Sequence, residues 1–456
     1  MIRSNDDLLT DHAPVGGGDR GRMPRRRFVL SVAATAGLTL LAGTPAAARP
    51  SATTGASTTP PSEAPGPGRP SASARTTAPF ALPATTGDYP IGTVALHLID
   101  PNRTDPWVTP ATRRELMVQL WYPTEHPDNR LLAPWLTPAE AGPVGRDLIE
   151  TVGGTPREVP GLAAVRTHAR LGAPVAIRRG GWPVVLFSPG FGAQRNSSAA
   201  IVEDLVSRGY VVAAIDHTHD AMAVEFPDGR IEPNTIIPLL RDIQDPEQLA
   251  VFARRMVEVR AADARFVLDR LAVLHTGGNP DAGGRCLPRG LVGAFRLTGV
   301  GMFGHSLGGA TAAQLMHDDP RISAGINLDG TPYGADAAAG LDRPFLLVAA
   351  EDHTRVDDPA WGTFADNLRG WHHEIRMAGA RHLSFHDTVL LGPALARLAD
   401  VPVERVTEVY GPIDGRRAVA VARAYVGAFF DLHLRQRNGH LFDGPSPRYP
   451  EVTFVS

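Results

Sequence analysis

The sequence predicts an α/β fold in which a mainly parallel sheet is covered by helices on both faces. Short β-rich runs alternate with helical patterns, which is typical of strands joined by crossover helices. Several runs, such as 184–187 and 211–215, are apolar without interruption, as expected of strands buried on both sides. The expected strands are 93–99, 116–122, 183–188, 210–215, 297–303, 322–328, 345–350 and 373–377, and the expected helices are 197–208, 246–274, 308–317 and 416–434.

The two runs 93–99 and 116–122 lie close together in the chain, so we expect them to pair antiparallel at one edge of the sheet. The helix 246–274 places apolar residues at spacings of three and four, which predicts a face packed on the sheet. A helix lying in a membrane surface is the alternative for that pattern. Because neither an internal repeat nor a second break in composition is visible, residues 87–456 are expected to form one large domain.

The N-terminal segment has the composition of an export signal. Three arginines, Arg25 to Arg27, precede an uncharged stretch that ends in three alanines at Ala48. This order predicts a twin-arginine-type signal peptide over residues 1–48, cleaved after Ala48, because the apolar part is too short and too polar for a stable membrane span. Residues 49–86 are rich in Ser, Thr, Ala and Pro and are expected to form a disordered linker.

Composition excludes several classes of function. The formal net charge of −3 argues against nucleic-acid binding, which needs a basic surface. All 45 basic residues are arginines, so lysine-dependent chemistry such as a Schiff base or a Walker motif is absent. The single cysteine, Cys286, allows neither an intramolecular disulfide nor a cysteine-based zinc cluster.

The most informative motif is the pentapeptide Gly-His-Ser-Leu-Gly at 304–308. An expected strand precedes it and an expected helix follows it, and this context is typical of a sharp turn that exposes a nucleophilic serine, here Ser306. The alternative is a glycine-rich turn with an incidental serine. The backbone N–H after the nucleophile, that of Leu307, is expected to be one of two oxyanion donors.

A serine nucleophile needs a histidine base and an acid, both later in the chain for this fold. His382 follows the last expected strand and ranks first as the base, ahead of His386 and the pair His372-His373. Two acids remain as alternatives, because Asp329 and Asp352 each follow an expected strand and spacing alone does not choose between them.

Several motifs together resemble one known family, the plasma type of platelet-activating factor acetylhydrolase and its bacterial relatives. They come in that family's order and lie between residues 116 and 434: Phe187-Ser188-Pro189-Gly190-Phe191-Gly192, Asp216-His217-Thr218-His219-Asp220, Gly304-His305-Ser306-Leu307-Gly308-Gly309-Ala310-Thr311, Asn327-Leu328-Asp329-Gly330 and Arg381-His382.

The resemblance implies an α/β-hydrolase fold and a triad of Ser306, His382 and Asp329. It also implies that the N–H of Phe191 is the second oxyanion donor. Pro189 departs from the pattern, because a histidine often stands there in the animal members. Related actinobacterial lipases and polyester hydrolases carry the acid one strand later, which keeps Asp352 as the alternative.

The run 216–220, Asp-His-Thr-His-Asp, has the residue types of a zinc site, but no third distant ligand is suggested. The resemblance places this run at a strand end beside the cleft, where it positions other groups. We therefore expect neither a metal nor an organic cofactor, and no obligate protein or nucleic-acid partner.

The expected function is that of a secreted serine esterase. The resemblance implies short or oxidised acyl groups at the middle position of a glycerophospholipid, with lipid surfaces as peripheral contacts. A triacylglycerol lipase or polyester hydrolase of the same fold is the first alternative, and a non-catalytic binding protein of the same fold is the second. The sequence does not set the depth of the acyl pocket, because the loops 221–241 and 276–296 could close or open it.

Overall fold

The computed structural model describes residues 78–455 except 128 and 335. The expected signal peptide, 1–48, and most of the expected linker lie outside the described residues. The strands are β1 (Ile91–Thr104), β2 (Arg113–Pro123), β3 (Leu132–Pro134), β4 (Arg166–Leu171), β5 (Trp182–Ser188), β6 (Val211–Asp216), β7 (Ala223–Glu225), β8 (Ile231–Pro233), β9 (Phe295–His305), β10 (Ile322–Leu328), β11 (Phe345–Ala350), β12 (His372–Met377) and β13 (Val452–Val455). The α-helices are α2 (Pro138–Thr151), α3 (Ala199–Ser207), α4 (Ile236–Asp242), α5 (Pro246–His275), α6 (Leu307–Asp318), α7 (Asp336–Ala339), α8 (Pro359–Asp366), α9 (Pro393–Ala399), α10 (Val403–Tyr410) and α11 (Gly415–Arg435).

The central sheet has eleven strands in the order β13-β12-β11-β10-β9-β5-β6-β2-β1-β4-β3. The six strands from β12 to β6 are parallel, as the alternation of strands and helices predicts. The first two expected strands do pair antiparallel, as β1 and β2. They are not at the edge, however, because β4 and β3 extend the sheet beyond β1. Sequence patterns missed β3, β4 and β13, which are short or polar and carry little apolar signal.

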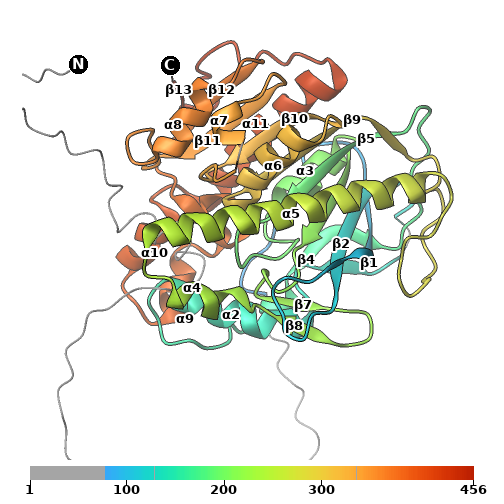
Figure 1. Cartoon of the computed structure of the whole chain (residues 1–456), viewed down its shortest axis with the longest axis horizontal. Helices are drawn as coiled ribbons and strands as arrows, with labels where there is room; N and C mark the ends of the chain where they lie inside the picture. The colour runs from blue at the N-terminus through green and yellow to red at the C-terminus, as the bar shows by residue number, and fades with distance from the viewer. Residues whose placement is uncertain (1–77, 128, 335, 456) are drawn as a thin grey trace, which may run out of the picture.

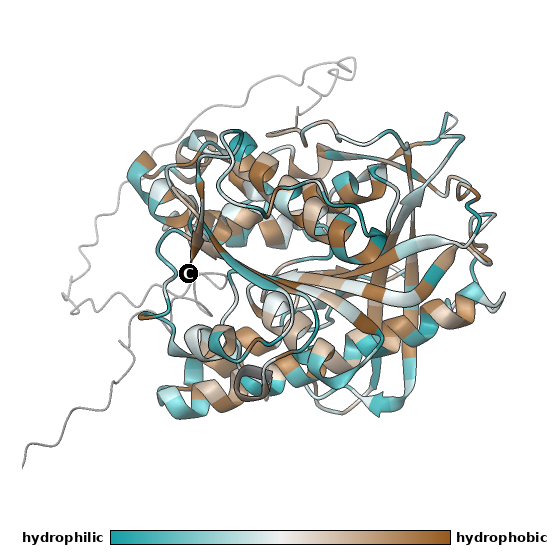
Figure 2. Cartoon of the chain, turned by 90° about the horizontal axis from the view of Figure 1, so that it is seen from above, coloured by the Kyte–Doolittle hydropathy of each residue, from teal (hydrophilic) through white to brown (hydrophobic). Residues whose placement is uncertain are grey.

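Helices cover both faces of the sheet, which confirms the expectation from the uninterrupted apolar runs. Alternate residues of one strand enter opposite cores, because successive side chains of a strand point to opposite faces. In β5, Val185 and Phe187 pack in the core with α3 and α11, whereas Val184 and Leu186 pack with α5, α6 and α8. The layers are visible in Figure 1, where α5 and α6 cross the near face, and in Figure 2, where helices lie above and below the sheet.

Helix α5 covers more than the sheet. Its second half, with residues such as Val267 and Leu271, packs on the sheet as predicted. Its first half packs instead with α4 and with the segments that follow β5 and β9, because Leu249 and Met256 share a core with Phe191. The apolar face of α5 thus continues past the sheet. Its first half covers the segments at the carboxyl ends of β5 and β9.

Helix α2 was not predicted, although its N-terminus carries a clear signal. Thr137 and Glu140 form a capping box, in which each side chain bonds the other's backbone N–H, and Pro138 follows the cap. Of the helices that the structure describes, none combines the length and the apolar character that a membrane span requires.

Two expectations about segment boundaries change. The last expected linker residues are packed on the domain, because Phe80 and Leu82 are buried and Arg423 donates to the carbonyls of Pro83 and Ala84. The loop 276–296 lies at the amino ends of β5 and β9, where Trp182 N–H donates to Ala294. It is therefore at the opposite end of the sheet from Ser306 and does not shape a pocket there.

Candidate active site

Ser306 stands at the sharp turn between β9 and α6, with φ 55° and ψ −125°. This left-handed conformation is strained for a residue with a side chain, and such strain is typical of a nucleophile turn. The flanking glycines are required by close backbone contact, because a Cβ on Gly308 would lie 2.0 Å from the Ser188 carbonyl oxygen. The glycines therefore allow β5, β9 and α6 to pack closely. The turn places the Ser306 hydroxyl beyond the end of the sheet.

His382 and Asp329 are brought to Ser306 by the neighbouring strands. His382 follows β12, and its Nε2 lies 2.9 Å from Ser306 Oγ. Its Nδ1 lies 2.7 Å from Oδ2 of Asp329, which follows β10 with a φ of 60°. All three side chains stand at the carboxyl ends of parallel strands, where this kind of sheet gathers its site.

Asp329 is held from a second side by another histidine. Its Oδ1 accepts from the backbone N–H of Ala350 at 2.6 Å and from His353 Nδ1 at 2.9 Å. His353 Nε2 in turn contacts Asp358 Oδ2 at 3.1 Å. Three donors thus hold the carboxylate of Asp329 in one orientation.

These contacts shift the pKa values of both partners. Burial raises the pKa of the Asp329 carboxyl, but the charge of His353 and the hydrogen bonds from both histidines outweigh burial and hold it well below its usual range. Burial lowers the pKa of His353, but the charges and hydrogen bonds of Asp329 and Asp358 outweigh it and raise the pKa to about 10. At neutral pH Asp329 is a carboxylate and His353 is a cation.

The other candidates lie elsewhere. Asp352 has a half-exposed side chain 3.6 Å from Arg381, whereas Asp329 is the carboxylate that contacts His382 Nδ1. His386 packs edge-on against His305, with ring centroids 4.5 Å apart. His372 and His373 begin β12, at the end of the strand away from Ser306. The geometry therefore favours His382 and Asp329.

The two expected oxyanion residues border one small recess beside Ser306. Phe191, on the loop after β5, and Leu307, at the start of α6, line it together with Ser306 and His382. The recess measures about 350 Å³, its open mouth included, and is otherwise mainly apolar, with walls from α5 and from the segment after β10. An ester carbonyl placed here would lie beside Phe191, Leu307 and the Ser306 hydroxyl.

The loop that carries Phe191 is fixed from below by Arg260 of α5. This buried arginine donates to the carbonyl oxygens of Pro189 at 2.6 Å and Gly190 at 3.1 Å. It also forms an ion pair with Asp220, whose Oδ2 lies 2.8 Å from the arginine Nε. Pro189 differs from the family pattern, but Arg260 still holds the carbonyl groups of both Pro189 and Gly190. Phe191 follows these two residues directly in the chain.

The run 216–220 supports this same loop. His217 Nε2 lies 2.9 Å from Ser188 Oγ and its Nδ1 lies 3.0 Å from Asp263, so both ring nitrogens are engaged. Asp216 pairs with Arg195, and Asp220 pairs with Arg260. Within the described part of the chain no cluster of three or more potential metal ligands is found. The run holds the loop through hydrogen bonds, as the resemblance implies.

Sequence patterns missed Arg260 and His353. Arg260 interrupts an apolar helix stripe, and a charged residue at a buried helix position is a signal of a specific partner. His353 follows Asp352 shortly after the end of β11. Residues at the carboxyl end of a parallel strand often belong to the functional site, so this position was a usable signal.

Comparison with known proteins identifies similar chains. A probable 1-alkyl-2-acetylglycerophosphocholine esterase of Arthroderma benhamiae is 29% identical over 398 residues, which cover 82% of this chain and 94% of that protein. The platelet-activating factor acetylhydrolase of Cavia porcellus is 24% identical over 60% of this chain and 63% of its own length. The structure is similar to that of a ferulic acid esterase from Streptomyces cinnamoneus, with a TM-score of 0.67, 38% identity and coverage of 83% of this chain and 100% of the esterase.

The family model described as platelet-activating factor acetylhydrolase, isoform II, matches residues 75–442. That range contains Ser306, Asp329 and His382 and all eleven strands of the central sheet except the last. The chain is an ester hydrolase of the α/β class and belongs to the platelet-activating factor acetylhydrolase, isoform II, family.

Proposed function

We propose that this chain is a secreted serine esterase that works through an acyl-enzyme on Ser306. One observation carries the proposal: Ser306, His382 and Asp329 form a continuous hydrogen-bonded chain, with 2.9 Å and 2.7 Å steps, that ends in the recess between Phe191 and Leu307. A hydroxyl is a weak nucleophile at neutral pH, so it needs a base within hydrogen-bond distance, and the base needs an anion to stabilise its charged form.

The reaction follows from this arrangement. Ser306 Oγ attacks the ester carbonyl carbon while His382 Nε2 takes the hydroxyl proton. The oxygen becomes an oxyanion, which accepts hydrogen bonds from the N–H groups of Phe191 and Leu307. The C–O bond to the alcohol then breaks, and His382 returns its proton to the leaving oxygen. Water attacks the acyl-enzyme by the same sequence and releases the acid.

Asp329 stabilises the charged form of His382 in each step, and His353 assists by holding the other oxygen of Asp329. With one oxygen bound to Ala350 N–H and to the His353 cation, Asp329 keeps its other oxygen on His382 Nδ1. Carboxylates held by several donors stay ionised and oriented, which keeps the imidazole in the tautomer that accepts the serine proton.

For the substrate, we propose short or oxidised acyl esters at the middle position of a glycerophospholipid. The names of the fungal and mammalian relatives and the small volume of the recess beside Ser306 support this class. The test is hydrolysis of two phosphatidylcholines that differ only in the middle acyl group, acetyl against palmitoyl, with Ser306→Ala as the blank. A strong acetyl preference is expected. Equal or reversed rates would move the assignment to a general lipase or polyester hydrolase.

A second candidate substrate class is favoured by the likeness to the ferulic acid esterase, because that protein matches over its whole length at 38% identity. The same catalytic groups would then act on an aromatic hydroxycinnamate ester. Comparing methyl ferulate with the acetyl phosphatidylcholine in one assay separates the two, since a small recess beside Ser306 is expected to favour the acetyl ester.

Export through a twin-arginine-type signal, with cleavage after Ala48 and a linker before the domain, is part of the proposal. The consecutive arginines and the alanine-rich end of residues 1–48 support it. Mass spectrometry of the secreted protein should find a mature N-terminus near Arg49.

A fluorophosphonate probe should label Ser306, and an unlabelled protein would instead support a non-catalytic binding role.

A further inference from the structure

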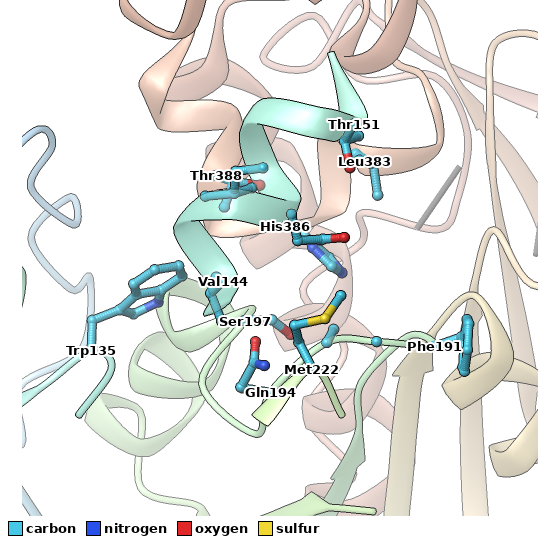
Figure 3. A pocket seen from close by; sticks show the side chains of 14 residues that line it. Trp135, Val144, Thr151, Phe191, Gln194, Ser197, Met222, Leu383, His386 and Thr388 are labelled. Carbon is cyan, nitrogen blue, oxygen red and sulfur yellow. The ribbon is translucent and has the colours of Figure 1, made fainter. Parts of the chain in front are cut away.

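A second recess lies on the other side of Phe191 from the nucleophile. Phe191 lines both recesses, and Leu383 lines the second one directly after His382 in the chain. The second recess measures about 480 Å³, its open mouth included, and lies between α2, the loop after β5 and the segment after His382. Figure 3 shows its side chains, with Gln194, Ser197, Met222 and His386 gathered at the centre.

Three polar atoms in this recess have no hydrogen-bond partner among the described residues. They are Nε2 of Gln194, Oγ of Ser197 and Nε2 of His386, and the three residues are only 5%, 6% and 8% exposed. Leaving a buried polar group without a partner costs about 1–3 kcal/mol, so such groups are normally satisfied. All three belong to side chains that line one recess, which indicates a place where a ligand supplies the partners.

The lining of the recess contains no cationic side chain at neutral pH. Burial and the nearby His382 lower the pKa of His386 to about 3, so its ring is neutral. Asp147, on α2, also lines the recess, and burial and the neighbouring Glu150 raise the pKa of its carboxyl. Because the lining contains no arginine, a carboxylate or phosphate would find no counter-charge here.

The recess is also tied to the catalytic groups by a row of histidine rings. His305 lies between His382 and His386, with ring centroids 4.6 Å and 4.5 Å away, and its Nε2 donates to the His382 carbonyl at 2.8 Å. The wall of the recess and the base therefore belong to one packed unit. A group bound there is held at a fixed position relative to Ser306.

We infer that this second recess is a substrate subsite for a neutral oxygen-bearing group, a hydroxyl or a carbonyl, on the part of the ester that extends past Phe191. The oxygen accepts from Gln194 Nε2, and a hydroxyl proton is donated to Ser197 Oγ or His386 Nε2. Apolar walls from Trp135, Met222 and Leu383 contact the carbon chain that carries the group. The inference rests on the proposed esterase function and adds the residues that select the substrate.

The test compares pairs of esters in which a hydroxyl replaces a methyl group. The acyl pair is p-nitrophenyl 6-hydroxyhexanoate and p-nitrophenyl heptanoate, and the alcohol pair is 4-hydroxybutyl butyrate and pentyl butyrate. The measured quantity is the ratio of kcat/KM within each pair. We expect wild type to prefer the hydroxylated member about tenfold in one pair, the value of one hydrogen bond that would otherwise be unmade, and the responding pair identifies the side of the ester that enters.

Gln194→Met keeps the length of the side chain and removes the amide, so the ratio should fall to near one. Ser197→Ala should lower it in part. The matched control is Gln244→Met, the same change at an exposed position between α4 and α5, which should keep the wild-type ratio. Because each ratio is taken within one variant, partial misfolding does not affect it.

A ratio near one in wild type for both pairs, or a preference that survives in both Gln194→Met and Ser197→Ala, would mean that the recess holds only water and would overturn the inference. Those results leave hydrolysis itself intact. By contrast, failure of wild type to hydrolyse any ester above the Ser306→Ala blank would overturn the proposed function and the inference with it.

Discussion

Two Ser-His-Asp chains of nearly the same geometry stand side by side at the carboxyl end of this sheet. In the first, His382 lies 2.9 Å from Ser306 Oγ and 2.7 Å from Asp329. In the second, His217 lies 2.9 Å from Ser188 Oγ and 3.0 Å from Asp263. Distances alone therefore do not tell which serine is the nucleophile.

The surroundings separate them. Ser188 ends β5 with ordinary strand geometry and is fully buried, as are His217 and Asp263. Ser306 has the strained conformation of a sharp turn and lines a recess, and the side chain of His382 is 19% exposed. Only the first chain can meet a substrate.

Charge separates them as well. Burial and the adjacent Arg260 lower the pKa of His217 to about 4, so this ring resists taking a proton at neutral pH. Asp263 also bonds Arg114 at 2.6 Å, and the second chain therefore serves to hold charges and the loop after β5 in place. A Ser-His-Asp geometry becomes catalytic only with access, oxyanion donors and a base that is free to accept a proton.

The largest predicted effect distinguishes the two serines. Ser306→Ala should lower kcat for p-nitrophenyl butyrate by a factor on the order of 10⁵–10⁶ and abolish fluorophosphonate labelling, because the variant lacks the hydroxyl that contacts His382. Ser188→Ala should keep labelling and lose about 1 kcal/mol of unfolding free energy with its hydrogen bond to His217. Labelling that persists in Ser306→Ala would contradict the assignment of Ser306, rather than Ser188, as the nucleophile.

Replacing the two acids should change different measured quantities, kcat for Asp329 and the free energy of unfolding for Asp263. Asp329→Asn should lower kcat about 10⁴-fold with little change in fold, because the amide disturbs the tautomer of His382. Asp263→Asn should instead lower the free energy of unfolding by about 3 kcal/mol, because it weakens the partner of buried Arg114. Kinetics and urea unfolding measure the two. Asp352→Asn serves as the control, and activity in Asp329→Asn equal to wild type would refute the assignment of the acid.

Arg260 links the second chain to the first, so its removal tests whether the loop after β5 must be held. Arg260→Met should lower kcat about 100-fold with a smaller effect on KM, because the N–H of Phe191 shifts from the oxyanion. Arg265→Met on the same helix removes an exposed guanidinium and should leave kcat near wild type. If the two variants gave equal kcat values, the loop would need no support from Arg260.

The smallest predicted effect concerns His353. Its folded pKa of about 10 lies above the ordinary value near 6.5, so its contribution to stability is full below pH 6.5 and is lost as pH rises through 10. His353→Gln should therefore be less stable than wild type at pH 7, with a difference that narrows toward pH 10, and kcat should fall roughly tenfold.

Urea unfolding at several pH values gives this difference, and His372→Gln, at an exposed histidine, is the matched control. A stability gap that stays constant between pH 7 and pH 10.5 would mean that His353 does not titrate as a cation on Asp329.

Much of the first chain was predictable because its signals are local. A glycine on each side of Ser306, after an apolar strand and before a helix, specifies a sharp turn whose geometry depends on neighbouring residues only. Likewise, the six parallel strands followed from short β-rich runs, most of them apolar, and the observed bounds differ from the predicted ones by two residues or fewer. The antiparallel pair β1 and β2 followed from proximity in the chain.

The choice between Asp329 and Asp352 was not available from local patterns, because both follow strands. It depends on the register of β10 against β11, in which Asp329 N–H donates to Val348 and its carboxylate accepts from Ala350. The family resemblance pointed to Asp329, and the packing of two strands gives the physical reason for that position.

By itself, the sequence determined the class of fold, the nucleophile turn and the expectation of His382, because strand periodicity and turn chemistry act over a few residues. Only the tertiary structure decided which acid meets His382, that Arg260 and His353 support the site, and that Gln194 and Ser197 face a second recess. Those contacts join residues that are far apart in the chain, and burial in a shared core, rather than local conformational preference, brings them together.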